Sequence, residues 1–185
     1  MPDDLERIEE RLTVLLAQEG DREAFGRLMD RYDRRLLYFV QRILGETDGA
    51  LDLLQSVWLI VHRRLRKLRS PEAFRVWLYQ IAHDQAVTEL RRKTKRPLPF
   101  EESVEFGSTD ATILDETAFE NAELVHAALR DLSVDHRRVL TLRFLEEMSI
   151  EEIAEVVGCA AGTVKSRLHY AKVALRRRIE VLLDV

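Results

Sequence analysis

The chain has 185 residues, of which 46 % are hydrophobic and 34 % charged, and its formal net charge is −4 at pH 7. This composition is typical of a globular chain that buries a core in one domain or two small ones. No uncharged apolar run approaches the roughly 20 residues of a membrane-spanning helix, and the acidic start MPDDLERIEERL does not match a secretory signal. We therefore expect a cytoplasmic protein without membrane insertion.

The sequence contains no recognisable motif for a metal site, a bound cofactor or an enzymatic active site. The single cysteine, Cys159, excludes an internal disulfide framework and any metal site built on a cysteine pair. The five histidines lack ligand spacings such as HExxH. The chain also lacks a glycine loop for phosphate and a nucleophile elbow. The sequence therefore predicts no metal, no cofactor and no enzymatic activity.

Charge is strongly segregated along the chain. Residues 97–129 contain no lysine or arginine but eight acidic residues: Glu101, Glu102, Glu105, Asp110, Asp115, Glu116, Glu120 and Glu123. Basic clusters lie on both sides, at residues 63–69, 91–96 and 165–178. This pattern predicts two cationic modules joined by an anionic linker.

In chain order, apolar residues at three- and four-residue spacings predict helices almost throughout and no strand. In the first module, one helix contains Ala24, Phe25, Leu28, Met29, Tyr32 and Leu36, a second contains Leu51, Leu54, Val57, Trp58 and Val61, and a third begins near Phe74 with Trp77, Leu78 and Ile81 on one side. Breaks are expected at residues 45–49 and 69–71, where glycine and proline occur. The predicted fold is all-α, with a first domain over residues 1–96.

The segment at residues 97–117 lacks helical periodicity and opens with two prolines, which predicts an extended acidic linker. A second helical domain is expected over residues 118–185. Within it, Ser149 and Glu152 have the spacing of a capping box, and Gly158 is expected to end the short helix that follows. A small residue at Ala154, the turn glycine and an apolar anchor at Val164 match a helix-turn-helix.

The second helix of this motif has Val164, Leu168, Ala171 and Leu175 on its expected inner face. The remaining positions are polar or basic, as in a recognition helix that enters the major groove. The candidate DNA-contacting residues are Thr163, Lys165, Ser166, Arg167, His169, Tyr170 and Lys172. An ordinary solvated helix face is the alternative interpretation.

The stretch EEIAEVVGCAAGTVKSRLHYAKVALR resembles the C-terminal promoter-binding region of bacterial sigma-70 family factors, especially the extracytoplasmic-function (ECF) class. GDREAFGRLMDRYDRRLLYFVQRIL, ALDLLQSVWLIVHRRL and FRVWLYQIAHDQAVTELRRKTKR resemble the N-terminal conserved region of that class, in the same order. The resemblance covers about residues 19–96 and 118–180. It implies a factor that binds core RNA polymerase and directs promoter-specific initiation.

The resemblance also implies roles for particular residues. Asp52, Leu53, Gln55 and Ser56 would dock on the coiled coil of the largest polymerase subunit, although Ser56 departs from the usual acidic residue and an ordinary domain surface is the alternative. The C-terminal domain would meet the polymerase flap, and the acidic linker would either enter a basic polymerase channel or act as a disordered spacer. An anti-sigma factor is implied as a further partner.

For the −10 element, the resemblance implies that residues 67–71 form a pocket for a flipped base and that the following helix assists strand opening. The residues assigned to this surface are Lys67, Arg69, Ser70, Arg75, Trp77, Tyr79, Asp84, Arg91 and Arg92. We expect Phe74 and Trp77 to be mainly core, and Arg75 and Tyr79 to be more available to DNA. Asp84 and Thr88 depart from the usual asparagine and aspartate, which predicts weaker strand opening.

Two other functions stay open. A stand-alone helix-turn-helix regulator would bind specific DNA without the polymerase, whereas a sigma factor would bind weakly until the core is present. A sigma-like protein with reduced promoter-opening activity is the other alternative, kept open by Ser56, Asp84 and Thr88.

Overall fold

The computed structural model describes residues 2–45, 48–94 and 122–183, and every element in these ranges is a helix or a helical turn. This confirms the predicted all-α class. The predicted linker at residues 97–117 lies outside the described residues. The chain divides into two compact units, Met1–Leu90 and Arg91–Val185. Among the described helices, none is long and apolar enough to span a membrane.

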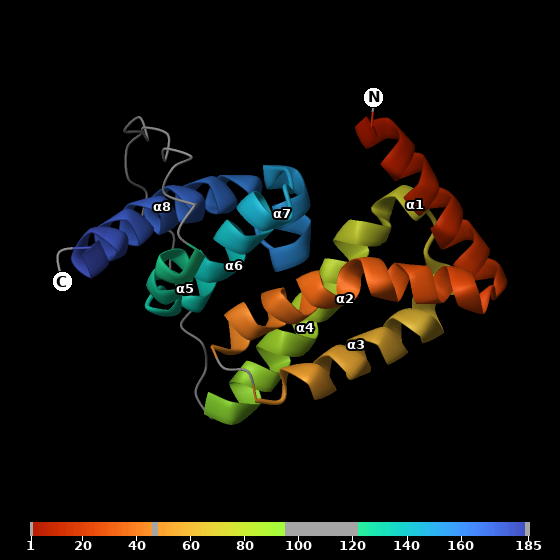
Figure 1. Cartoon of the computed structure of the whole chain (residues 1–185), viewed down its shortest axis with the longest axis horizontal. Coiled ribbons are helices and arrows are strands. Elements are labelled where there is room, and N and C mark those ends of the chain that lie inside the picture. The colour runs from red at the N-terminus through yellow and green to blue at the C-terminus, as the bar shows by residue number, and fades with distance from the viewer. Residues whose placement is uncertain (1, 46–47, 95–121, 184–185) are drawn as a thin grey trace. The chain divides into compact units, whose positions relative to one another are not determined.

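The first unit is built from α1 (Pro2–Glu19), α2 (Arg22–Leu44), α3 (Ala50–Arg64) and α4 (Phe74–Thr94) (Figure 1). Asp21 caps α2, because its carboxylate accepts hydrogen bonds from the amides of Glu23 and Ala24. Gly45 and Gly49 have φ values of 77° and 78°, which glycine adopts without strain. The predicted break between the second and third helices therefore lies where expected.

An aromatic cluster joins α2 to α4. The ring of Tyr32 meets those of Phe74 and Tyr79 at centroid distances of 5.8 and 6.5 Å, and Phe39 lies 5.3 Å from Tyr79. Tyr79 is consequently 0 % exposed, so the expectation that it is available to DNA was wrong. Phe74 is buried, as predicted, and Trp77 is half-buried.

The distribution of buried residues around α4 explains why Tyr79 was wrongly expected to be exposed. Its buried apolar residues are Phe74, Val76, Leu78, Tyr79, Ile81, Ala82, Ala86, Val87 and Leu90. At 100° per residue these positions cover most of the helix circumference, so helical periodicity does not define a single inner face. The helix is enclosed by its neighbours over much of its length, and Tyr79 lies inside.

The second unit contains α5 (Ala122–Arg130), α6 (Val134–Leu140), a π-helical turn (Thr141–Leu145), α7 (Ile150–Val157) and α8 (Ala161–Leu183). Ser149 and Glu152 form the predicted capping box, and Gly158 ends α7 with φ of 68°. Val164, Leu168, Ala171 and Leu175 are all buried on α8, which confirms the predicted inner face. Packing of α8 against α5, α6 and α7 produces this burial.

Candidate nucleic-acid and polymerase interfaces

The helix-turn-helix consists of α7, the turn at Gly158–Ala160 and the first half of α8. Burial of Val164 and Leu168 fixes the rotation of α8, so Lys165 and Ser166 between them are turned outward. Lys165 and Ser166 are exposed, and the Ser166 hydroxyl donates to the carbonyl oxygen of Gly162 at 3.2 Å. Lys165 has no ion pair among the described residues, so its charge is available to a phosphate or a base edge.

Arg167 differs from its neighbours on the predicted recognition face. Its side chain is only 18 % exposed, and Nη2 lies 3.4 Å from a carboxylate oxygen of Asp135 on α6. Its Nη1 also donates to Cys159 Sγ at 3.7 Å. The guanidinium therefore contacts the interior of the unit, whereas Lys165 and Ser166 are turned to solvent.

The other half of the Asp135 carboxylate pairs with Arg138, three residues along α6. Burial lowers the pKa of the Arg138 guanidinium, and the Asp135 charge acts in the opposite direction. One carboxylate is thus the shared counter-charge of two arginines that are mostly withdrawn from water, and the three groups keep a net charge of about +1. This explains why a charged pair persists beside the base of the recognition helix.

The remaining candidates on α8 have partial contacts within the unit. The rings of His169 and Tyr170 meet edge to face at 5.3 Å, and Tyr170 is 38 % exposed. Lys172 Nζ lies 5.9 Å from the ring centroid of Phe144, a cation–π distance. Thr163 is half-buried. The structure therefore groups Lys165, Ser166 and Tyr170 as the most exposed candidates.

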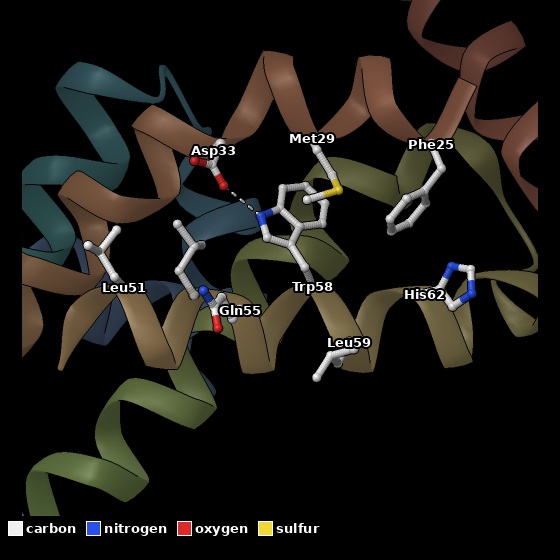
Figure 2. A pocket seen from close by; sticks show the side chains of 9 residues that line it. Phe25, Met29, Asp33, Leu51, Gln55, Trp58, Leu59 and His62 are labelled. Atoms are coloured by element: carbon white, nitrogen blue, oxygen red, sulfur yellow. Dashed lines mark hydrogen bonds between the residues drawn. The ribbon is translucent and has the colours of Figure 1, made fainter. Parts of the chain in front are cut away.

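A groove of about 550 Å³ lies between α2 and α3 in the first unit (Figure 2). Its lining residues are Phe25, Met29, Asp33, Leu51, Leu54, Gln55, Trp58, Leu59 and His62. Trp58 forms the floor, where its indole N–H donates to Asp33 at 2.9 Å. Phe25 meets the rings of both Trp58 and His62 edge to face. The floor is thus held in place by a polar bond and aromatic contacts.

Of the four residues expected to dock on the polymerase, Gln55 lines this groove, whereas the other three lie elsewhere on α3. Asp52, Gln55 and Ser56 are exposed on α3. The Ser56 hydroxyl donates to the Asp52 carbonyl oxygen at 3.0 Å, so it satisfies a backbone acceptor of its own helix. Leu53 is only 8 % exposed, so its assignment to a docking surface was wrong. It faces the core between the exposed positions.

Two leucines that extend the groove outward were not assigned to any site. Leu51, expected on the buried face, is 61 % exposed, and Leu59 is 57 % exposed. Both positions lie four residues from Gln55, and residues at that spacing share a helix face. The signal in the sequence is the pair of leucines placed four residues before and four residues after the polar Gln55. The result is an apolar rim suited to another helix.

The residues assigned to promoter opening lie in the loop before α4 and along that helix. Lys67, Arg69 and Ser70 are exposed, as are Asp84, Arg91 and Arg92, whereas Arg75 and Trp77 are half-buried. Asp84 lies 3.1 Å from His83 Nδ1, and its carbonyl oxygen accepts from the Thr88 hydroxyl at 2.7 Å. Thr88 therefore contacts the α4 backbone, and the two departures from the family pattern are adjacent.

Exposed cations concentrate at the end of α3 and in the loop that follows. Arg63, Arg64, Arg66, Lys67 and Arg69 are all exposed. None of these five forms an ion pair with another residue in the described part of the chain. Such a cluster repels itself and attracts phosphates. We call these five residues the loop cations.

Comparisons with known proteins agree with this organisation. The family model "Sigma-70 region 2" matches residues 28–96, and "Sigma-70, region 4" matches residues 122–175. The RNA polymerase sigma-H factor of Pseudomonas aeruginosa is 34 % identical over 176 residues, covering 90 % of this chain and 91 % of that protein. The ECF RNA polymerase sigma-E factor of Escherichia coli is 30 % identical, covering 96 % of this chain and 98 % of that protein.

Solved structures share the fold. CnrH in complex with the cytosolic domain of CnrY superimposes with a TM-score of 0.65 at 24 % identity, covering 95 % of this chain and 97 % of that one. The sigma factor RpoE of Bartonella quintana, solved with the anti-sigma factor NepR, gives 0.62 at 24 % identity, covering 85 % and 97 %. Two regional models in order and relatives aligned over nearly the whole length show that the chain belongs to the sigma-70 family, as an extracytoplasmic-function sigma factor.

Proposed function

We propose that this sigma factor binds core RNA polymerase through the α2–α3 groove, contacts the upstream promoter element through Lys165, Ser166 and Tyr170, and assists strand opening through residues 66–93. Catalysis belongs to the polymerase, and the factor acts in the cytoplasm. In this proposal residues 1–96 form the domain for core docking and −10 recognition, residues 97–117 the acidic linker, and residues 118–185 the −35 domain, which also meets the polymerase flap.

The main support for the proposal is that the two units present two different surfaces, an apolar groove on one and a helix-turn-helix on the other. One unit presents an apolar groove with the exposed amide of Gln55 among its lining residues and the exposed Asp52 on the same helix, which suits a helical partner better than DNA. The other presents the outward half of a helix-turn-helix with Lys165, which has no ion pair in the described part of the chain. A stand-alone regulator would need only the second surface.

A regulatory partner is part of the proposal. The solved relatives CnrH and RpoE were each captured with another protein, in the second case a named anti-sigma factor. We propose that this chain is likewise held inactive by an anti-sigma factor. The apolar rim at Leu51 and Leu59 would lose its exposure in such a complex, and competition with core polymerase would follow.

The test is reconstitution with core RNA polymerase on fragmented DNA of the source organism, with transcript starts mapped by sequencing. Discrete starts that share two spaced elements support the proposal. Specific DNA binding by the chain alone, without core binding, would instead establish the stand-alone regulator. Core binding without discrete starts would show reduced promoter opening, the third function left open by the sequence.

A pair of exposed-leucine variants tests the docking surface. Leu51→Glu with Leu59→Glu places two charges on the rim and should lower core affinity by at least tenfold, because complete burial of one leucine side chain alone contributes about 1.5–3 kcal/mol. The matched control is Ile8→Glu on α1, which is 54 % exposed and lies outside the groove. Equal core affinity in both variants would remove the groove from the interface.

A further inference from the structure

The loop of residues 65–73 between α3 and α4 has little internal structure. It consists of two 3-10 turns, Leu65–Lys67 and Pro71–Ala73, and Ser70 between them is extended, with φ of −121° and ψ of 113°. Within the loop, the backbone bonds are from Leu68 to Leu65 and from Ala73 to Ser70. Three of the loop cations, Arg66, Lys67 and Arg69, repel one another here. Such a loop needs outside contacts to keep one conformation.

Those contacts come from α1, which lies against both turns. Gln18 Nε2 donates to the carbonyl oxygen of Leu65 at 2.9 Å and to that of Leu68 at 2.7 Å. A primary amide has two N–H donors, and both are used here on carbonyls about 50 residues away. Gln18 is half-buried and Leu65 is buried, so water competes weakly for these bonds.

A second connection reaches the far end of the loop. Arg11 Nε lies 2.9 Å from Glu72 Oε1, and the Ser70 hydroxyl donates to Glu72 Oε2 at 2.6 Å. The Ser70 bond is the main cause of the lowered pKa of Glu72, followed by a backbone bond and the Arg11 charge. The ion pair is more than half exposed and contributes little energy. It nevertheless joins the extended residue Ser70 to α1.

Together the two connections hold the backbone before, between and after Lys67 and Arg69, at Leu65, Leu68 and Ser70 to Glu72. Residues on the α1 face toward the core, Val14 and Ala17, are buried, so α1 itself is a fixed support. Since Gln18 follows the buried Ala17 directly, the backbone that carries the Gln18 side chain is held in place. The loop cations are therefore presented from a fixed backbone rather than from a mobile one.

We propose that α1 is a positioning element for promoter opening: Gln18, with Arg11 and Glu72 in support, holds the loop at residues 65–73 in the conformation that receives the separated DNA strand. This inference rests on the proposed function, because it assigns the loop to DNA. Gln18 is a positioning residue and does not touch DNA itself. Its loss leaves every loop cation in place but requires the loop to be ordered when DNA binds.

The decisive variant is Gln18→Met, which keeps side-chain length and helix propensity but removes both donors. The matched control is Gln41→Met on α2, a half-buried glutamine without a side-chain hydrogen bond in the described structure. A second variant, Glu72→Gln, removes the exposed ion pair and preserves the fold. Its effect should be smaller than that of Gln18→Met.

Opening is measured by the fluorescence of 2-aminopurine placed in the −10 element of a start site mapped with the unmodified holoenzyme. Gln18→Met should lower the equilibrium constant for opening by about tenfold, as expected for two lost hydrogen bonds of ordinary net strength. Core affinity and the salt dependence of initial duplex binding should be unchanged, because no charge is altered. Gln41→Met should open the promoter like the unmodified factor.

Loop order is measured without the polymerase by limited trypsin digestion of the full chain. Trypsin cleaves after lysine and arginine, so faster cleavage after Lys67 and Arg69 in Gln18→Met reports a loosened loop. Unchanged cleavage and unchanged opening would overturn the proposal. So would an equal loss of core affinity and opening, which would show a purely structural role. If the unmodified chain fails to start transcription, the proposed function fails, while the digestion still decides whether Gln18 orders the loop.

Discussion

Arg167 Nη2 on the recognition helix lies 3.4 Å from Asp135 Oδ2 on α6, and both side chains are at most one-fifth exposed. The pair joins the DNA-facing half of α8 to a helix outside the helix-turn-helix. Because Asp135 also binds Arg138, its carboxylate is the shared partner of two mostly buried cations. The orientation of the recognition helix therefore depends on a residue that the helix-turn-helix pattern does not include.

Replacing Asp135 by asparagine should destabilise the second unit by about 1–3 kcal/mol, since two partly buried guanidinium groups lose their counter-charge. Asp131→Asn is the matched control, because its pair with Arg178 is 44 % exposed on both sides and should contribute less than about 1 kcal/mol. Urea unfolding followed by far-UV circular dichroism measures both. Equal stabilities would show that the Asp135 pair contributes no more than a surface contact.

Lys165→Ala should weaken binding of the holoenzyme to the −35 element. If Lys165 contacts a phosphate, the slope of log affinity against log salt concentration should fall by about 0.9. If it contacts a base edge, discrimination between elements should also fall, by about 1–3 kcal/mol. Arg177→Ala is the control, since Arg177 is exposed on the same helix and has no ion pair in the described structure. Identical losses in both variants would indicate a general charge effect.

The helix-turn-helix was largely predictable because its signals are local. The capping box, the turn at Gly158 and the inner face of α8 each depend on residues within a few positions of one another. Packing between distant segments was less predictable. The withdrawal of Arg167 requires Asp135, some 30 residues away, and the burial of Tyr79 requires Tyr32 and Phe39 on another helix.

Helices were predicted almost throughout, but no particular helix was assigned to the residues of α1, although their sequence contains a signal. Leu5, Ile8, Leu12 and Leu15 recur at three- and four-residue spacings, yet they are exposed by 40–64 %. The residues that dock α1 on its unit include Val14, Ala17 and Gln18 on another face. Periodicity alone would have found the helix but assigned the wrong inner face. The polar anchor Gln18 has no sequence signature.

Gly158→Ala should destabilise the second unit by about 1 kcal/mol, because φ of 68° is strained for a residue with a Cβ even though the added atom meets open space. Gly162→Ala is the matched control for Gly158→Ala. It also meets open space, but Gly162 lies within the first turn of α8 and lacks a positive φ, so alanine should stabilise the helix by up to about 1 kcal/mol. Circular dichroism during urea unfolding should show opposite signs. Equal changes in the free energy of unfolding in the two variants would contradict backbone strain at residue 158.

Tyr32 should make the first unit sensitive to alkaline pH. Its hydroxyl donates to Glu10 at 2.8 Å, and burial followed by the Glu10 charge raises the pKa of Tyr32 far above its ordinary value of about 10. The folded state then keeps a proton that the unfolded state releases. Stability is fully present below about pH 10 and falls above it, by up to about 1.4 kcal/mol per pH unit for this group.

Tyr32→Phe isolates this contribution. The variant should lose about 1 kcal/mol below pH 10 through the missing hydrogen bond, while Glu10 keeps its ion pair with Arg31 at 3.4 Å. Above pH 10 its stability should decline less steeply than that of the unmodified chain. Both tryptophans, Trp58 and Trp77, belong to the first unit, so tryptophan fluorescence during urea unfolding reports on that unit. Parallel pH profiles in the two proteins would show that Tyr32 ionises as readily in the folded state as in the unfolded chain.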